Sequence, residues 1–224
     1  MSTTLKAKLE AAAAHNPQWK EDAVAVVEDL LARVGTFAER TDAYRKAAKE
    51  RRESDVPADA ALVKTPADVI DAIDEVTKAE RTLVFDLNDL ASYVVTLIPP
   101  IKEEDNSGVA VQQAFLDLVK ETVATLNGAG KDANPRLVHL GAKAEYLAKR
   151  SELEMKLAPT GKDAEAPASE SLRRAMHEVD NATVANVAAT FAELRRACLT
   201  VASAFIHNQG KIEKPRRDGS GMIG

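Results

Sequence analysis

The densest group of side chains that could do chemistry is one short acidic run, residues 102–108, which reads KEEDNSG. It places three carboxylates beside an amide and a hydroxyl, and such oxygen groups are the usual ligands of calcium. An EF-hand is excluded, because the alternating ligands and the distal glutamate of that motif are missing. The spacing by itself favours a solvated turn in which Asp105, Asn106 or Ser107 caps the helix that follows.

The other reactive side chains form no catalytic or metal-binding pattern. Neither HExxH nor the Glu-x-x-His pair of di-iron bundles occurs, and Walker, GxSxG and GxGxxG motifs are missing as well. The four histidines are scattered, at His15, His139, His177 and His207. The single cysteine, Cys198, lies on the apolar stripe of a predicted helix, which favours a buried structural thiol. We therefore expect no catalytic residue, no metal site and no cofactor.

Composition and charge narrow the classes of function further. The 224 residues carry 35 acidic and 30 basic side chains, with a net charge of −5, and only 4% are aromatic. A nucleic-acid interface needs a basic face, so no nucleic-acid partner is expected. No segment has the roughly 18 uncharged apolar residues that a membrane span requires, and the N-terminus lacks a signal-peptide pattern. We expect a protein of the cytoplasm or nucleus, where a lone cysteine fits the reducing conditions.

The hydrophobic period predicts four long helices, at about residues 19–52, 66–98, 108–157 and 170–213. Their apolar residues alternate spacings of four and three, as in a heptad seam. The seam of the second helix comprises Val69, Ile73, Val76, Glu80, Leu83, Leu87, Leu90, Val94 and Leu97. Glu80 is its one polar member, and we expect it to be paired or to face another subunit. Thr65 is the predicted N-cap of this helix, with Pro66 as its first helical residue.

The third helix is predicted to begin at Gly108 and to contain an insert at residues 127–135, after which the helical pattern resumes. Its apolar stripe is predicted as Val111, Phe115, Leu118 and Thr122, widened by Val119, Val123 and Leu126. Because the pattern is helical on both sides of the insert, we interpret the whole as one long element.

Four long helices and no useful β-alternation predict an all-α antiparallel bundle over residues 17–213. Residues 1–16 are then an N-terminal extension, and residues 214–224 a flexible tail. In an up-down-up-down bundle, the connection at 99–107 and the end of the fourth helix emerge at the same end. The acidic run and the tail are therefore expected to share one face of the molecule.

The acidic run and its flanks also resemble a known family. The string IPPIKEEDNSGVAVQ, residues 98–112, is similar to the activation loop of the 11S proteasome activators, the REG or PA28 family. That loop follows a helix ending at Ile-Pro and has an acidic stretch with Asn, then Gly-Val and a Gln opening the next helix. The version here is most similar to the homoheptameric protozoan activators. The residues IEKPR at 212–216 and MIG at 222–224 resemble the end of the same family.

The resemblance implies a ring of seven identical subunits around a central channel, docked on the α ring of the 20S proteasome. It implies that a tail enters pockets between α subunits, where the main-chain carboxylate of Gly224 pairs with a lysine. The matching tail residues are Ser220, Gly221, Met222, Ile223 and Gly224.

The resemblance further implies that the activation loop displaces the turns that hold the proteasome gate, without ATP. The matching loop residues are Ile101, Lys102, Glu103, Glu104, Asp105, Asn106, Ser107 and Gly108. Among them, Glu104 is the residue expected to contact the gate turn.

Other interpretations stay open on the residues alone. A helical scaffold or coiled-coil adaptor with no proteasome role fits the amphipathic seams equally well. A gate opener that inserts a hydrophobic-tyrosine-X terminus is disfavoured, because Ile223 stands in the place of the tyrosine. A helix lying on a membrane surface is disfavoured too, since the polar faces carry mixed charge rather than a basic stripe.

Overall fold

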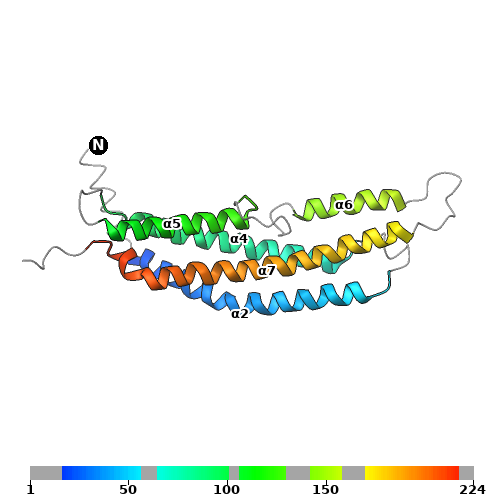
Figure 1. Ribbon diagram of the computed structural model, residues 1–224, viewed down its shortest axis with the longest axis horizontal. Helices are drawn as coiled ribbons and strands as arrows, with labels where there is room; N and C mark the ends of the chain where they lie inside the picture. The colour runs from blue at the N-terminus through cyan, green and yellow to red at the C-terminus, as the bar shows by residue number, and fades with distance from the viewer. Residues whose placement is uncertain (1–16, 57–64, 101–105, 130–141, 158–169, 217–224) are drawn as a thin grey trace, which may run out of the picture.

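The computed structural model describes residues 17–56, 65–100, 106–129, 142–157 and 170–216. Within these ranges all regular structure is helical, which confirms the predicted all-α class. The helices are α2 (Pro17–Glu53), α4 (Ala67–Thr96), α5 (Ser107–Leu126), α6 (Ala142–Leu157) and α7 (Glu170–Glu213) (Figure 1). None of these described helices has the length and apolar character needed to cross a lipid bilayer.

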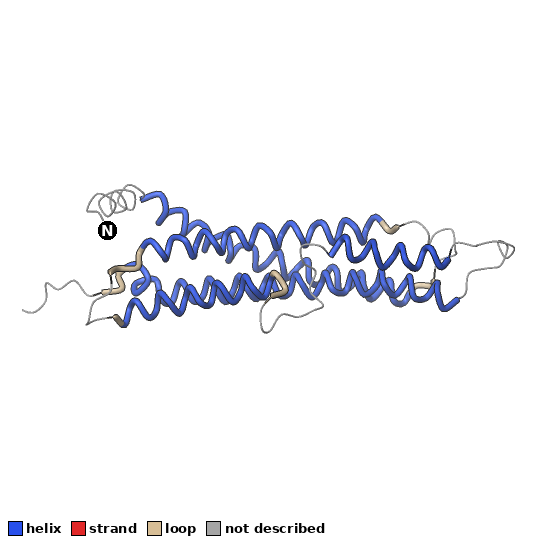
Figure 2. The backbone as a smooth tube through the Cα atoms, turned by 90° about the horizontal axis from the view of Figure 1, so that it is seen from above, coloured by secondary structure: helices blue, strands red, loops and turns tan. Residues whose placement is uncertain are grey.

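The helices lie along one common axis and form the predicted antiparallel four-helix bundle (Figure 1, Figure 2). The two longest, α2 and α7, have 37 and 44 residues and pack against each other along much of their length. Helices α5 and α6 follow one another along the same side of α7, so together they occupy the position of one helix of the four-helix bundle. Each of the four positions buries an apolar stripe against its neighbours, as helices of a bundle do.

The start of α4 differs from the prediction by one residue. Pro66 occupies the N-cap position that the sequence assigned to Thr65, and no side chain caps this helix. The backbone of Pro66 is extended (φ −62°, ψ 120°), and its carbonyl accepts a hydrogen bond from the Ile70 amide at 3.4 Å. The φ that the proline ring imposes is compatible with a helical or an extended ψ, so the residue can precede the helix as readily as begin it.

The predicted seam of α4 is confirmed as the centre of the core. Its members from Val69 to Val94 are buried, and Leu97 is partly buried. They pack with apolar residues of α7, which include Val187, Phe191, Leu194, Val201 and Phe205. An unbroken four-three pattern is therefore a reliable sign of burial in this chain.

The buried stripe of α5 is rotated from the predicted one. Its buried residues are Gly108, Gln112, Phe115, Val119, Thr125 and Leu126. Val111 and Leu118, which the sequence placed at the centre of the stripe, are only partly buried. The prediction missed this rotation because a glutamine occupies a core position, where its amide binds the main chain of two other helices.

The N-terminal half of α7 also buries polar residues that the apolar pattern did not select. Asp180 and Asn181 are 3% and 1% exposed, whereas the predicted stripe residues Val179 and Thr183 are only partly buried. Asp180 can occupy this position because its carboxylate is paired with Arg150 of α6.

Glu80 is buried in the middle of α4, and no hydrogen-bond partner lies beside its carboxylate in the described part of the chain. Its side chain is 1% exposed, and neither carboxylate oxygen accepts a hydrogen bond within the described structure. The predicted paired or subunit-facing position is therefore wrong for the described part of the chain, where the carboxyl is enclosed and unpaired. Burial raises the pKa of Glu80 to about 7, although the nearby charge of Arg81 acts to lower it.

Replacing Glu80 with Gln is expected to remove a pH-dependent penalty on folding. The folded state holds the Glu80 proton up to about pH 7, whereas the unfolded chain releases it near pH 4.5. The raised pKa of Glu80 therefore contributes fully to the free energy of unfolding below pH 4.5. That contribution is lost as the pH rises through 7. At about 1.4 kcal/mol per pKa unit, the loss above pH 7 amounts to about 3.5 kcal/mol.

The measurement is urea unfolding of the parent and of Glu80→Gln between pH 5 and 8, with Glu178→Gln as an exposed control. The free energy of unfolding of the parent should fall relative to that of Glu80→Gln as the pH rises. The control should follow the parent. Parallel curves for parent and Glu80→Gln would contradict the buried, unpaired state of the carboxyl.

Candidate functional site

Three helix ends meet at one end of the bundle: the C-terminal end of α4, the N-terminal end of α5 and the C-terminal end of α7 (Figure 1). The connection between α4 and α5 and the segment after α7 therefore leave the bundle together, which confirms the expectation from topology. Two side chains, from Gln112 and Arg216, join the three ends by hydrogen bonds. We call the following residues the loop–tail junction: Leu97, Pro100, Asn106, Gly108, Gln112, Ile212, Pro215 and Arg216.

Gln112 is the buried part of the junction. Its side chain is fully enclosed, and its Nε2 donates to the carbonyl oxygens of Ile212 at 2.7 Å and Leu97 at 3.2 Å. The last carbonyls of a helix lack partners within that helix, so burying them requires donors from elsewhere. One amide group of α5 thus satisfies carbonyls at the ends of both α4 and α7.

Gly108 allows the chain after α7 to cross the first turn of α5 closely. Gly108 is buried, and a Cβ atom built on it would overlap the carbonyl group of Pro215. Because the obstruction is backbone rather than a flexible side chain, a larger residue would force the two segments apart. The glycine of the acidic run is therefore required by packing against the start of the tail.

Arg216 is the outer part of the junction. Its Nη2 donates to the carbonyl oxygen of Pro100 at 2.6 Å and to Oδ1 of Asn106 at 3.3 Å. Pro100 follows α4 and Asn106 immediately precedes α5, so one guanidinium group contacts both ends of the connection between these helices. Asn106 occupies the N-cap position of α5, but its side chain makes no capping hydrogen bond to the helix.

The start of α2 is tied to the same end of the bundle. Lys20 Nζ donates to Glu213 Oε2 at 2.7 Å, and Gln209 Nε2 donates to Oε1 of the same carboxylate at 2.9 Å. Partial burial acts to raise the pKa of Glu213, but the hydrogen bonds from Lys20 and Gln209 outweigh it, so the pKa is lowered. Since Lys20 is exposed, this ion pair adds little stability, and it serves mainly to position α2 against α7.

The structure describes only part of the predicted site. Asn106 and Ser107 are exposed at the start of α5, and Gly108 is buried beside Pro215. The remaining predicted loop residues, Ile101, Lys102, Glu103, Glu104 and Asp105, lie outside the described residues. The predicted tail residues, Ser220, Gly221, Met222, Ile223 and Gly224, lie outside them as well.

Sequence reasoning missed the two side chains that hold the junction together. Gln112 and Arg216 both belong to strings that resembled the activator family, but neither was assigned a role. Their hydrogen-bond acceptors are mostly main-chain carbonyls, and the identity of a residue does not reveal which carbonyls its side chain will reach. A polar residue at a core register, as at Gln112, is the one signal that could have been used.

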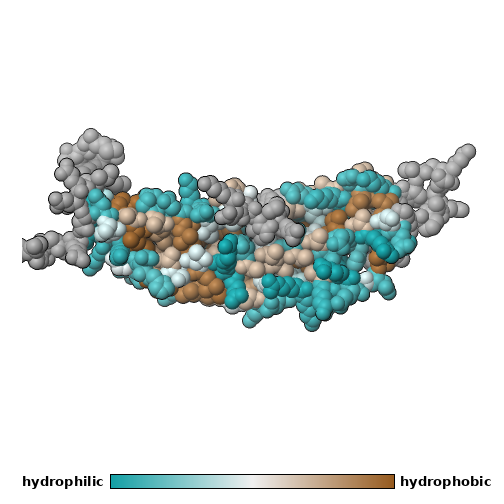
Figure 3. All heavy atoms as spheres, viewed as in Figure 1, coloured by the Kyte–Doolittle hydropathy of each residue, from teal (hydrophilic) through white to brown (hydrophobic). Residues whose placement is uncertain are grey.

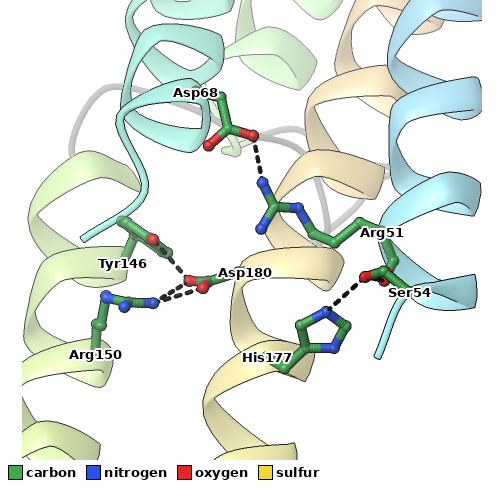
Figure 4. Close-up of polar contacts among 7 residues, drawn as sticks. All are labelled: Arg51, Ser54, Asp68, Tyr146, Arg150, His177 and Asp180. Atoms are coloured by element: carbon green, nitrogen blue, oxygen red, sulfur yellow. Dashed lines mark hydrogen bonds and ion pairs between the residues drawn. The ribbon is translucent and has the colours of Figure 1, made fainter. Parts of the chain in front are cut away.

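A second polar cluster lies between α6 and α7 (Figure 4), and α6 lies toward the end of the bundle opposite the loop–tail junction (Figure 1). Arg150 Nη1 lies 2.5 Å from both carboxylate oxygens of Asp180, and the Tyr146 hydroxyl donates to Asp180 at 2.7 Å. Burial and the hydrogen bond to Asp180 raise the pKa of Tyr146. All three side chains are buried, so the cluster is best explained as an ionic link between two helices.

The described residues show no arrangement suited to catalysis. Among them, no group of three His, Cys, Asp or Glu side chains could hold a metal ion. Cys198 is fully buried, and burial raises the pKa of its thiol to about 12, which makes it a poor nucleophile. His177 contacts Ser54 and His207 contacts Ser203, while His15 and His139 lie outside the described residues.

The chain is similar to proteins of one family. The family model for proteasome activator PA28, C-terminal, matches residues 62–222. The human protein called proteasome activator complex subunit 3 is 28% identical over 155 residues, which are 69% of this chain and 55% of that protein. The chain thus spans about half the length of this curated relative.

Solved structures agree with this similarity. A chain in a complex of an archaebacterial 20S proteasome with PA26 is 25% identical, with a TM-score of 0.77 over 91% of this chain and 93% of that chain. The 11S subunit of the Plasmodium falciparum proteasome, PA28, has the same fold, with a TM-score of 0.66 and 12% identity. That alignment covers 96% of this chain and 93% of the other.

Proposed function

Because the chain belongs to the proteasome activator PA28 family, we propose that it is an ATP-independent activator of the 20S proteasome. The observation that carries this proposal is the loop–tail junction, which places the ends of the acidic loop and the start of the tail at one end of the bundle. A protein that must dock and open a gate on the same partner surface needs both elements at one end. The similarity to a chain of a proteasome–PA26 complex supports the same conclusion.

The loop and the tail have separate tasks in this proposal. The tail residues Ser220–Gly224 bind pockets between subunits of the proteasome α ring and hold the activator in place. The activation loop, Ile101–Gly108, displaces the turns that keep the gate closed, with Glu104 as the main contact. The start of α5 is held in the bundle at Gly108, so the loop pushes from a rigid base.

We propose that the active form is a homo-heptameric ring with a central channel. The face shown in Figure 3 carries apolar patches among polar residues. Over the described residues as a whole, the exposed large apolar side chains are Leu31, Phe85, Val95, Ile98, Leu147, Met155, Leu199 and Ile206. Exposed apolar patches of this kind suit contacts between subunits. A ring also presents several tails at once, which raises the effective concentration of each later contact.

The protein has no enzymatic activity of its own in this proposal. Peptide bonds are cleaved by the proteasome, and the activator only changes access to the chamber. We expect it to act in the cytoplasm or nucleus, alongside the proteasome it binds.

The experiment that tests this function adds the purified protein to latent 20S particles and follows hydrolysis of fluorogenic peptides without ATP. We expect hydrolysis to rise until the activator saturates the particles. Native mass measurement should show a ring in the same preparation. Intact rings that cause no stimulation would contradict the proposal and would favour a helical scaffold with no proteasome role.

Replacing Glu104 with Ala is expected to remove stimulation while docking is kept. The tail is unchanged in this variant, so the affinity for 20S particles should stay within about twofold of the parent, whereas the maximum rate should fall by about tenfold, as loss of one strong contact implies. Binding is measured by co-sedimentation and stimulation by peptide hydrolysis at saturation.

The matched control is Glu121→Ala, which removes an exposed carboxylate from α5 outside the loop. It should behave as the parent in both measurements. If Glu104→Ala lost docking instead, the loop would be part of the binding surface rather than the element that opens the gate.

A further inference from the structure

We infer that Arg216 is a positioning residue that couples the docked tail to the activation loop. This inference rests on the proposed function, in which the tail docks and the loop opens the gate. It goes further by assigning a single side chain to the link between these two tasks.

The first support is the geometry of the contacts. The Arg216 guanidinium donates to Pro100 at 2.6 Å and to Asn106 at 3.3 Å, which are the two described ends of the connection between α4 and α5. A change in the position of Arg216 therefore acts on both ends of the loop at once. The residue itself lies where the tail begins, just after α7 ends at Glu213.

The second support is the rigid base from which Arg216 extends. Ile212 is fully buried and its carbonyl is held by Gln112, while the Lys214 amide donates to the Gly210 carbonyl at 3.1 Å. Pro215 has a restricted backbone and lies against Gly108. The guanidinium is thus presented from a fixed segment, and it can hold the loop ends in one place.

The third support is the chemistry of the side chain. A guanidinium offers several donors in one plane, so it can bind a main-chain carbonyl and an amide oxygen together. A lysine provides a single flexible ammonium and matches this arrangement less well. The contacts are also charge-assisted, which makes them stronger than hydrogen bonds between neutral groups.

The two layers of the junction differ in what their loss would do. Gln112 is fully buried, so its removal would leave carbonyls of α4 and α7 without partners and would weaken the fold. Arg216 is only partly buried, so it can be removed while the core stays intact. Replacing Arg216 therefore tests the link between the tail and the loop without weakening the fold.

The first test uses the free protein and does not depend on the proteasome. Hydrogen exchange is followed at the Ala110 amide, which donates to the Asn106 carbonyl at 2.9 Å in the first turn of α5, in the parent, Arg216→Ala and Lys214→Ala. Loss of the charge-assisted contact to Asn106 should speed exchange there by about tenfold in Arg216→Ala. Lys214→Ala removes a neighbouring exposed charge and should leave exchange unchanged. Unchanged exchange in Arg216→Ala, or faster exchange throughout the bundle, would overturn the inference.

The second test measures docking and stimulation separately with latent 20S particles. Arg216→Ala should bind within about twofold of the parent affinity but show a several-fold lower maximum rate of peptide hydrolysis at saturation. Arg216→Lys should recover part of the lost rate, and Lys214→Ala should match the parent. Equal maximum rates for parent and Arg216→Ala would overturn the coupling, and so would a loss of docking.

A double variant identifies the route of the effect. Because Arg216 contacts the start of α5 at Asn106, the double variant Arg216→Ala with Asn106→Ala should speed exchange by less than the two single effects combined. Additive effects would mean that the two residues act independently, and the inference would fail. If the parent protein itself fails to stimulate 20S particles, the proposed function fails, whereas the exchange measurements still decide whether Arg216 holds the loop ends.

Discussion

Removal of Met222, Ile223 and Gly224 is expected to abolish stimulation of the 20S proteasome while the bundle stays folded. The described helices and the loop–tail junction are complete without these three residues. Thermal unfolding and the mass of the assembly should therefore match those of the parent. The proposed loop is also unchanged, so any loss of stimulation reports on docking.

The expected loss is large because, in the proposed ring, the tails act together. The sequence predicts a flexible tail, and each tail contact is then expected to be weak by itself, since ordering such a segment costs entropy. Tails on one ring reinforce each other through their high effective concentration, and deleting the contact from every copy removes this gain at once. The apparent affinity for 20S particles should fall by more than about 100-fold.

Binding to immobilised 20S particles and peptide hydrolysis are the two measurements. Glu104→Ala is a useful counterpart, because it should bind normally and give a maximum rate about tenfold lower. A truncated protein that stimulates as well as the parent would contradict the docking role of the tail.

Replacing Asp180 with Ala is expected to destabilise the bundle by about 3 kcal/mol, because Arg150 then loses its buried carboxylate partner and keeps only the more exposed Glu154. Arg150 is 1% exposed and ion-paired with Asp180, whose carboxylate also accepts a hydrogen bond from Tyr146. Burial acts to lower the pKa of Arg150, but the hydrogen bond and charge of Asp180 outweigh it and raise the pKa. The guanidinium therefore stays charged, and removing the carboxylate cannot be relieved by deprotonation.

Two further variants make this prediction specific. Asp74→Ala breaks the exposed ion pair between α4 and Lys143 of α6, and it should cost less than about 1 kcal/mol. The double replacement Asp180→Leu with Arg150→Met removes both charges, and it should lie much closer to the parent than Asp180→Ala does. All four proteins are compared by urea unfolding. Equal stability of Asp180→Ala and Asp74→Ala would contradict the prediction and would show that the remaining ion pair with Glu154 is enough for Arg150.

The sequence predicted most accurately the parts that apolar spacing alone determines. In α4 the four-three pattern identified the buried face along the whole helix. In α5 and the first half of α7 the buried positions include Gln112 and Asp180, and a pattern of apolar residues cannot select such side chains. Each of them is buried because a specific partner lies opposite, which is a property of the tertiary structure.

The candidate site was predictable to a similar extent. Helix count was enough to place both ends of the acidic loop and the start of the tail at the same end of the bundle, because successive helices of an antiparallel bundle alternate in direction. The contacts of Arg216 were not predictable, because Pro100 accepts through its main-chain carbonyl. Only the folded arrangement of α4, α5 and α7 brings that carbonyl within reach.

The burial of Cys198 has a practical consequence for labelling. It is the only cysteine in the chain, and its thiol is both enclosed and held protonated by a raised pKa. Maleimide dyes react with exposed thiolates, so Cys198 should be labelled very little in the folded protein. A single cysteine introduced on the surface could carry a fluorophore without removing the native one. Reaction of the native thiol would in turn signal that the bundle has opened.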